Sequence, residues 1–325
     1  MAVSIDDVRR AAAVLDGVTV RTPVLRNDLL DERTGGSVLL KAECLQRGGS
    51  FKLRGAYNKI ASLPEDDRRR GVSAVSSGNH AIAVALSARL LGTTAVILVP
   101  HDAPAAKIDV VRRLGAEIVT YDRFAEDRDE VTARFVADQG LPFVPPYDDP
   151  AIIAGQGTAA LELVDEVGDL DAIVVPVSGG GLIAGSGIAV RDRCPTARVI
   201  GVEPAAMDDT RRSLAAGERV TVPVAPTIAD GLTVTAPGAV TWPINRAQLT
   251  AVVTVTDDQL VDAVRFLFDE VHLAVEPSGA AGVAALLSGA VDVAGQRVGV
   301  ILSGGNLGTG RFIDLAGGSP GRARG

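Results

Sequence analysis

The sequence predicts an α/β fold whose strands are largely parallel. Over most of the 325 residues, short apolar runs alternate with stretches of helical period, which is the pattern of repeated strand–helix units. Twice, a predicted strand ends in a loop of small residues that leads directly into a predicted helix. At about 100–200 residues per domain, the chain is long enough for two domains with cores of their own.

Composition and charge exclude several classes of protein. A net charge of −8 with 3% aromatic residues argues against nucleic-acid binding, which needs a basic face and stacking rings. The most apolar stretch, Ala81–Val99, is interrupted by polar residues and falls short of the about 20 apolar residues of a membrane span. The first residues are acidic where a signal peptide is basic, and Cys44 and Cys194 form no CxxC pair. We therefore expect a cytoplasmic enzyme that acts on a small molecule.

Predicted elements in the first half follow from capping signals and from apolar runs. Ser4 and Asp7 have the spacing of a capping box, which predicts a helix from there to about Leu15. Runs rich in Val, Ile and Leu predict strands, and the amphipathic stretches between them predict helices. The strands are expected at Val38–Ala42, Val72–Ser76, Ala95–Val99 and Glu117–Thr120, and the helices at Asn79–Leu91, Ala105–Leu114 and Asp127–Asp138.

The Pro-rich piece Leu141–Pro150 is the best candidate for a domain boundary. Beyond it the alternation of apolar runs and helical stretches continues. The predicted elements there are the helix Gly157–Glu166, the strand Ala172–Val177, the helix Leu182–Arg193, the strand Arg198–Val202, the helix Gln259–Val271 and the strand Val298–Leu302. The tail from Gly317 is rich in Gly, Pro and Arg, and we expect it to be frayed.

The two loops of small residues are candidate anion sites. A loop at a helix N-terminus presents free backbone N–H groups and the positive end of the helix dipole. The triple-glycine loop, Ser178-Gly179-Gly180-Gly181, would let the backbone wrap around a phosphate group. The Ser-Gly-Asn loop, Ser77-Gly78-Asn79-His80, adds polar side chains that suit a carboxylate. A third loop, Ser303-Gly304-Gly305-Asn306, follows the last predicted strand. The alternative is that these are tight turns without a ligand.

One reading of the triple-glycine loop leads to a different enzyme class. Gly179, Gly181 and Ala184 follow a strand and open a helix, and Glu203 ends the next predicted strand. That is close to the fingerprint of NAD-binding proteins with their ribose-binding acid. Against it, an NAD-dependent dehydrogenase would leave Lys52 and the Ser-Gly-Asn-His segment without a role.

Lysine is scarce, with four residues against 28 arginines, so a retained lysine is a candidate for chemistry that arginine cannot perform. Lys52 follows two glycines and Phe51 and has no acidic neighbour in the sequence. That setting favours a Schiff-base amine, although a solvated surface lysine would look similar.

Taken together, the segments resemble the pyridoxal-phosphate enzymes of fold type II, and most closely the serine/threonine dehydratase and serine racemase branch. The resemblance extends from about Asp6 to Asn306 and rests on six segments in family order. These are Ser50-Phe51-Lys52-Leu53-Arg54-Gly55-Ala56, Ser76-Ser77-Gly78-Asn79-His80, Ala154-Gly155-Gln156-Gly157-Thr158, Ser178-Gly179-Gly180-Gly181-Leu182, Gly201-Val202-Glu203-Pro204 and Ser303-Gly304-Gly305-Asn306.

The resemblance implies a two-domain fold like that of tryptophan synthase β, each domain an open, twisted, mostly parallel sheet flanked by helices. Residues 1–70 and 148–325 would form the large cofactor-binding domain, and residues 71–147 the small mobile domain. The family suggests a homodimer. This chain departs from the family at Ile82, where a Gln is usual after Asn-His-Ala, so its amino-acid substrate stays open.

The resemblance also assigns roles to residues of this chain. Lys52 would form the Schiff base with pyridoxal 5'-phosphate, and Phe51 would pack on the cofactor ring. The other cofactor contacts would be Asn79 at the 3-hydroxyl, Ser303 at the pyridine nitrogen, and Ser178, Gly179, Gly180, Gly181 and Leu182 at the phosphate. The substrate carboxylate would lie on Ser76, Ser77, Asn79 and His80. A Mg²⁺ or Ca²⁺ site would use the carboxylates of Glu203 and Asp209 and the backbone carbonyl of Met207, which are oxygen ligands suited to hard cations.

The implied activity is the conversion of a β-hydroxy amino acid such as L-threonine or L-serine to a 2-oxo acid and ammonia. Lys52 would remove the α-proton. Racemisation of serine or of 3-hydroxyaspartate is the nearest alternative, because Ser77 could carry a proton on the opposite face. A ligand sensor that kept the fold is a further possibility, disfavoured by the intact Lys52 and anion loops.

Overall fold

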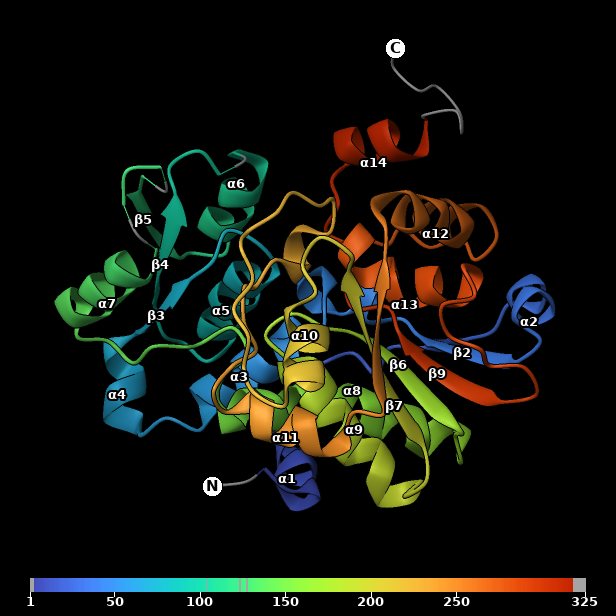
Figure 1. The fold of residues 1–325 in the computed structure, drawn as a ribbon. Coiled ribbons are helices and arrows are strands. Elements are labelled where there is room, and N and C mark those ends of the chain that lie inside the picture. The colour runs from blue at the N-terminus through green and yellow to red at the C-terminus, as the bar shows by residue number, and fades with distance from the viewer. Residues whose placement is uncertain (1–2, 104, 123, 127, 318–325) are drawn as a thin grey trace, which may run out of the picture.

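Two separate sheets organise the chain in the computed structural model, which describes residues 3–103, 105–122, 124–126 and 128–317. The small sheet and its helices lie at the left of Figure 1, and the large sheet lies at the right. Both sheets are parallel, apart from one short antiparallel edge strand in the large sheet. The predicted α/β class with mostly parallel sheets is thereby confirmed.

The large sheet brings both halves of the chain together. Its six strands run in the order β1-β2-β9-β6-β7-β8. They are β1 (Val24–Leu25), β2 (Ser37–Lys41), β6 (Ala172–Pro176), β7 (Arg198–Pro204), β8 (Ala251–Val255) and β9 (Arg297–Ile301). Lys41 of β2 is in register with Ile301 of β9, so residues near both ends of the chain form neighbouring strands.

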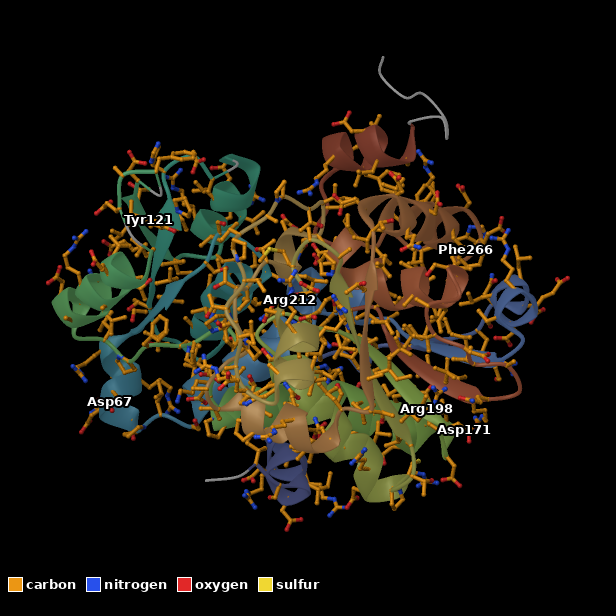
Figure 2. All side chains as sticks on the ribbon, viewed as in Figure 1. Asp67, Tyr121, Asp171, Arg198, Arg212 and Phe266 are labelled. Atoms are coloured by element: carbon orange, nitrogen blue, oxygen red, sulfur yellow. The ribbon has the colours of Figure 1, made fainter. Side chains whose placement is uncertain are left out.

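Loops that leave the carboxyl ends of neighbouring parallel strands emerge at the same edge of this sheet. Ser178 follows β6, Ser303 follows β9, and Glu203 lies at the end of β7. The opposite edge is marked by Asp171 and Arg198, which Figure 2 shows close together and which join through a backbone hydrogen bond of 2.9 Å. The carboxyl edge is where open parallel sheets place their ligands.

The small sheet has the order β3-β4-β5 and carries helices on both faces. Its strands are β3 (Val72–Val75), β4 (Ala95–Pro100) and β5 (Glu117–Tyr121), and its helices are α5 (Asn79–Leu90), α6 (Ala105–Arg113) and α7 (Arg128–Gln139). A bridge between Ser73 and Phe143 brings the chain back along β3 before it returns to the large sheet.

The remaining helices pack mainly around the large sheet. They are α1 (Ile5–Leu15), α2 (Asp28–Thr34), α3 (Lys52–Ala61), α4 (Glu65–Arg70), α8 (Pro150–Val167), α9 (Gly181–Arg193), α10 (Asp209–Ala216), α11 (Thr241–Gln248), α12 (Asp257–Asp269), α13 (Pro277–Leu287) and α14 (Thr309–Ala316), with the short 3-10 turns η1 (Glu43–Leu45), η2 (Arg47–Gly49) and η3 (Asp230–Leu232). One buried cluster lies on each face of the sheet, under α12 and α13 on one side and under α8 and α9 on the other.

The helix after the Pro-rich segment begins earlier than the sequence predicts. It starts at Pro150 instead of Gly157, because Asp149 accepts hydrogen bonds from two N–H groups of its first turn. Gly155 and Gly157 lie inside this helix, where glycine ordinarily weakens helix formation. A Cβ atom at Gly155 would lie 2.6 Å from the carbonyl oxygen of Arg54, and one at Gly157 would lie 2.8 Å from that of Gly185. Close packing between helices, and not an interruption of the helix, therefore explains these glycines.

Other predicted elements agree with the structure to within two residues at each end. The capping box at Ser4 and Asp7 is present, and it begins the helix that ends at Leu15. The expected frayed tail lies, apart from Gly317, outside the described residues. Within the part of the chain that the structure describes, none of the helices combines the length and apolarity that crossing a bilayer requires.

Candidate active site

Lys52 lies at the first turn of α3, directly beside the loop that contains Ser303. An antiparallel bridge joins Ser50 to Gly304, and the Phe51 N–H donates to the Ser303 carbonyl at 3.1 Å. The Lys52 Nζ donates a hydrogen bond of 2.6 Å to the Pro146 carbonyl and lies 5.2 Å from the centre of the Phe51 ring. The structure therefore brings Lys52, Phe51 and Ser303 together, as the resemblance implies.

Burial gives the Lys52 amine a reactivity that an exposed lysine lacks. Desolvation lowers the pKa of Lys52 to about 8, because removal from water disfavours the charged ammonium form. About a tenth of such amines is neutral at pH 7, whereas an ordinary lysine is almost fully charged. Lys52 can therefore act as a nucleophile and as a base near neutral pH.

His80 is buried beside Lys52 and is held in its neutral form. Burial, and after it the charge of Lys52, lowers the pKa of His80 to about 3. Its Nε2 donates to the Val144 carbonyl at 2.8 Å, so Nδ1 carries no proton. Nδ1 has no hydrogen-bond partner within the described part of the chain. His80 can thus accept a hydrogen bond here, but it supplies no positive charge for a carboxylate.

The glycine loop, Ser178–Leu182, forms a backbone cradle at the N-terminus of α9. Gly180 has the left-handed φ of 90°, and no side chain in the described residues caps this buried helix end. The Tyr147 ring occupies the space that a side chain at Gly179 would need. Since Pro146 contacts Lys52 and Tyr147 contacts Gly179, the cradle and the amine both lie against one dipeptide. Uncapped N–H groups and the helix dipole fit a phosphate group.

A second helix N-terminus carries the predicted substrate loop. Gly78 is the N-cap of α5 and provides no side-chain cap within the described chain, while Ser76 Oγ accepts from the Gly78 N–H at 3.2 Å. Ser77 and Asn79 are partly buried there. The Ser76–His80 loop and the glycine loop are thus two helix ends suited to anions, contributed by different sheets.

Asn79 is fixed by Asn306 of the third small-residue loop and by Glu276, which lies in none of the motifs. Its Nδ2 donates to Glu276 Oε1 at 2.5 Å, and its Oδ1 accepts from Asn306 Nδ2 at 2.8 Å. Glu276 lies at the N-cap of α13, ahead of a proline at the first helical position. An acid followed by Pro-Ser-Gly was the available sequence signal, but its proximity to Asn79 arises only from the fold. The amide of Asn79 is therefore held in one orientation.

The predicted cation ligands are placed close to one another around the end of β7. Glu203 is fully buried, and burial raises its pKa to about 7. Asp209 is also buried, and its pKa is raised to about 8 by burial and then by the charge of Glu203. Asp209 Oδ2 has no hydrogen-bond partner among the described residues. Two buried carboxylates, one with an unsatisfied oxygen, fit a divalent cation.

The predicted set contains only two carboxylates, and Met207 was expected to contribute its backbone carbonyl. Met207 is buried, but its sulfur accepts a hydrogen bond from the Ala225 N–H at 3.2 Å. Asp208 is engaged by the side chains of Arg211 and Arg212, the latter labelled in Figure 2. The described residues contain no group of three or more His, Cys, Asp or Glu side chains that could hold a metal ion. A cation would therefore need backbone or water oxygens in addition.

The residue that would bind the ribose in the NAD-binding alternative has a structural role here. Glu203 Oε1 accepts from the Thr210 N–H at 2.9 Å, and Oε2 accepts from the Arg211 N–H at 3.0 Å. Both oxygens cap the N-terminus of α10, and each keeps a lone pair for a further partner. The triple-glycine loop resembles the dinucleotide fingerprint only because both end a strand at a helix N-terminus.

Comparisons with known proteins agree with this geometry. The family model for pyridoxal-phosphate dependent enzymes matches residues 15–304. The chain is 44% identical, over 96% of its length and 98% of the relative, to an L-threo-3-hydroxyaspartate ammonia-lyase of a Pseudomonas species. It is 41% identical, over 94% of its length and 76% of the relative, to an L-threonine ammonia-lyase of Thermotoga maritima. Maize serine racemase superposes with a TM-score of 0.92 at 39% identity, over 97% of both chains.

Proposed function

Because the chain belongs to the pyridoxal-phosphate dependent enzymes, we propose that it is an ammonia-lyase for β-hydroxy amino acids. The products are a 2-oxo acid and ammonia. The observation that carries the proposal is the Lys52 amine, which desolvation makes reactive and which contacts Pro146, the neighbour of the Tyr147 that packs on the glycine loop.

The residues present fit the cofactor. Lys52 would hold it covalently, the Ser178–Leu182 backbone would hold its phosphate, and Asn79 and Ser303 would contact the ring at the 3-hydroxyl and the nitrogen. When bound, pyridoxal phosphate supplies an electron sink for the negative charge left at the α-carbon of the substrate. Ser303 offers a neutral hydroxyl there, and so it would not hold a proton on the ring nitrogen as an aspartate would.

The residues of the chain supply binding and proton transfer. The uncapped N–H groups of α5, with Ser76, Ser77 and Asn79, would bind the substrate carboxylate. The Lys52 amine would take the α-proton, since its lowered pKa leaves a neutral fraction near neutral pH. Loss of the β-hydroxyl as water leaves an enamine, which hydrolyses after release to the 2-oxo acid and ammonia.

Absorbance tests the Schiff base directly. The purified protein loaded with cofactor should show a band near the visible edge that borohydride removes. Lys52→Ala should lack the band and all turnover. Lys59→Ala is the matched control, because Lys59 lies on the same helix and pairs with Asp149 at 2.6 Å. Retention of more than a few per cent of turnover in Lys52→Ala would contradict the assignment.

The substrate is best assigned with a panel. L-Serine, L-threonine and L-threo-3-hydroxyaspartate share the β-hydroxyl and differ in what the β-carbon carries, and relatives named for the last two lie at 41% and 44% identity. Release of 2-oxo acid from each, compared as kcat/KM, ranks them. We propose that at least one of the three is turned over. If a protein that shows the Schiff-base absorbance band releases no 2-oxo acid from any of the three, the ammonia-lyase proposal is wrong and only cofactor binding remains.

Racemisation is the second candidate, because relatives named serine racemase are 41% identical and Ser77 lies in the predicted substrate loop. Reprotonation from the face opposite Lys52 needs a proton carrier, and we propose Ser77 for this role. Ser77→Ala should abolish exchange between D- and L-serine while sparing much of the dehydration of the L-enantiomer. Equal loss of both activities would instead make Ser77 a carboxylate-binding residue.

We propose that Mg²⁺ or Ca²⁺ binds at Glu203 and Asp209, near the backbone of Met207. The unsatisfied Asp209 Oδ2 and the mutual repulsion of the two buried acids support it. Added cation should raise the melting temperature by mass action, and a chelator should lower it. Asp209→Asn should remove this response. Melting temperatures unchanged by cation and chelator in the wild type would contradict the site.

The arrangement of the protein in solution is proposed from the same family. Residues 71–147 would move as a small domain against residues 1–70 and 148–325, and two chains would form a homodimer in the cytoplasm. Light scattering should give twice the mass of one chain. A monomer that is fully active would contradict the homodimer as the working unit.

A further inference from the structure

A row of buried polar side chains on α11 faces the glycine loop from behind. Thr241, Asn245 and Gln248 are 0%, 1% and 7% exposed. They are spaced four and three residues apart, so they lie on one face of the helix. Buried polar groups of this kind require partners, and each of the three finds its partner in a backbone carbonyl of the Gly179–Ala184 segment.

Two of these bonds fasten the loop itself. The Thr241 Oγ1 donates to the Gly179 carbonyl at 2.6 Å, and the Asn245 Nδ2 donates to the Gly180 carbonyl at 3.1 Å. Each carbonyl also accepts from a backbone N–H, that of Gly238 at 3.3 Å and that of Ala184 at 3.0 Å, and the side chains add to this restraint. The described chain has no cis peptide bonds. In a trans peptide the N–H points away from the carbonyl of the same unit. Holding these two carbonyls towards α11 therefore turns the N–H groups of Gly180 and Gly181 away from α11.

The backbone of the loop is adapted to this contact. Gly180 has a φ of 90°, a conformation that other residues rarely adopt. A Cβ atom at Gly180 would collide with the Asn245 amide nitrogen, so that amide occupies the space a side chain would need. The start of α11 is itself fixed, because the Asp148 carboxylate accepts from the N–H groups of Ala239, Val240 and Thr241.

We propose that Thr241 and Asn245 are positioning residues that aim the N–H groups of the glycine loop at the phosphate of the cofactor. The inference rests on the proposed function and deepens it. Ser178–Leu182 contains no basic side chain, so its affinity for an anion depends on how many N–H groups point at one place. The carbonyl oxygens would repel the phosphate if these peptides turned over, and the two side chains oppose that turn.

Gln248 is the internal control on the same helix face. Its Nε2 donates to the Ile183 and Ala184 carbonyls at 3.1 and 3.0 Å and makes a longer contact of 3.4 Å to Asn245 Oδ1, which leaves the Asn245 Nδ2 bond to the loop in place. Those carbonyls lie beyond the loop, and the N–H that shares a peptide with the Ile183 carbonyl is already bonded to the Gly180 carbonyl at 3.0 Å. Loss of the Gln248 bonds should weaken the packing of α11 on α9 without turning an N–H group of the loop.

The test compares two ligands that differ only in the phosphate. Dissociation constants of pyridoxal 5'-phosphate and of pyridoxal are measured on the apoprotein by absorbance. Thr241→Val and Asn245→Leu should each weaken binding of the phosphate ester about tenfold, which corresponds to about 1.4 kcal/mol, and leave pyridoxal binding within a factor of about two. Thr241→Ser, which keeps the hydroxyl, should bind both ligands like the wild type. Gln248→Met should lower the melting temperature with the ratio of the two constants unchanged.

The outcomes separate the inference from the function on which it rests. A wild-type protein that forms no Schiff base with either ligand would overturn the proposed function. A normal wild type with variants that lose both ligands equally, or neither, would overturn the positioning role. Circular dichroism of each apoprotein establishes that the variants are folded, and Asn245→Leu decides the matter if Thr241→Val does not fold.

Discussion

At the scale of single residues, desolvation, and not a neighbouring acid or base, lowers the pKa of Lys52 and makes its amine reactive. Desolvation accounts for the lowering of its pKa, and His80 beside it stays neutral down to about pH 3. The sequence showed Lys52 as an unusual lysine between small residues, which was enough to nominate it. It could not show Glu276, because this acid reaches Asn79 across 197 positions of the chain.

The pH dependence of cofactor capture follows from this pKa. Only the neutral amine attacks an aldehyde, so the rate of capture by the apoprotein should rise with pH. The midpoint should lie near pH 8 and not near the 10.5 of an ordinary lysine. The measurement is the rate of appearance of the Schiff-base band after mixing apoprotein with pyridoxal.

His80, the titratable neighbour of Lys52, does not interfere with that measurement, since it carries no charge between about pH 6 and about pH 10. Lys52→Ala should show no band at any pH. A midpoint close to that of free lysine would mean that the amine is solvated, and the burial argument would have to be given up.

At the scale of elements, the sequence could not show where helices approach one another closely, and this explains the misplaced start of α8. The helix after residue 149 was placed too late because glycines in a helical stretch resemble a break. Their reason is tertiary, since α8 crosses α9 where Gly157 meets Gly185 and crosses α3 where Gly155 meets the Arg54 backbone. Elements with strong local signals, such as the capping box at Ser4, were predicted correctly.

Two glycine-to-alanine substitutions should therefore have opposite signs. In an exposed helix the exchange stabilises by about 0.5–1 kcal/mol, because alanine loses less backbone entropy on folding. Gly310 in α14 has open space around it among the described residues, so Gly310→Ala should be stabilising. Gly157→Ala should destabilise by about 1–3 kcal/mol, since its Cβ would lie 2.8 Å from the Gly185 carbonyl oxygen. Urea denaturation of the apoproteins measures both free energies, and a stabilised Gly157→Ala would show that α8 and α9 can separate.

At the scale of the whole molecule, the feature that local sequence patterns do not show is the pairing of strands far apart in the chain. Strand–helix alternation predicted parallel sheets, but periodicity alone does not show that β2 pairs with β9 across the length of the chain. The edge strands β1 and β8 were not predicted, because β1 has two residues and β8 is only partly buried. The order of the motifs supplied what periodicity lacked, since it implied a domain built from both chain ends.

A buried ion cluster around Arg54, two residues after Lys52 on α3, ties these distant parts together. The guanidinium of Arg54 makes paired hydrogen bonds of 2.7–2.8 Å with the carboxylates of Glu43 and Glu162. Lys41 of β2 donates to Glu162 at 2.6 Å. Burial raises the pKa of Glu43, but the charge and hydrogen bonds of Arg54 outweigh this and hold it below its usual value. Two cations and two anions thus balance in a cluster that joins β2, η1, α3 and α8.

The charge balance of the cluster predicts that a second substitution repairs the first. Arg54→Met leaves Glu43 and Glu162 facing Lys41 alone, and an uncompensated buried charge typically costs about 3–5 kcal/mol. Arg54→Met combined with Glu43→Met leaves the balanced pair of Lys41 and Glu162. Replacing a buried ion pair with apolar side chains is often neutral, so the double variant should be more stable than Arg54→Met by about 1 kcal/mol or more.

Urea denaturation of the apoproteins checks this, since bound cofactor would add its own stabilisation. The matched surface control is Arg69→Met, whose partners Glu65 and Asp66 are 71% and 86% exposed. Exposed pairs of this kind contribute about 0–1 kcal/mol, so this variant should remain close to the wild type. Glu43→Met is also measured alone. If the losses of unfolding free energy in Arg54→Met and Glu43→Met simply add in the double variant, each side chain contributes by its packing alone. The cluster would then not act as one charge-balanced unit, and the rigidity of the support for Lys52 would have to come from the apolar contacts of α3.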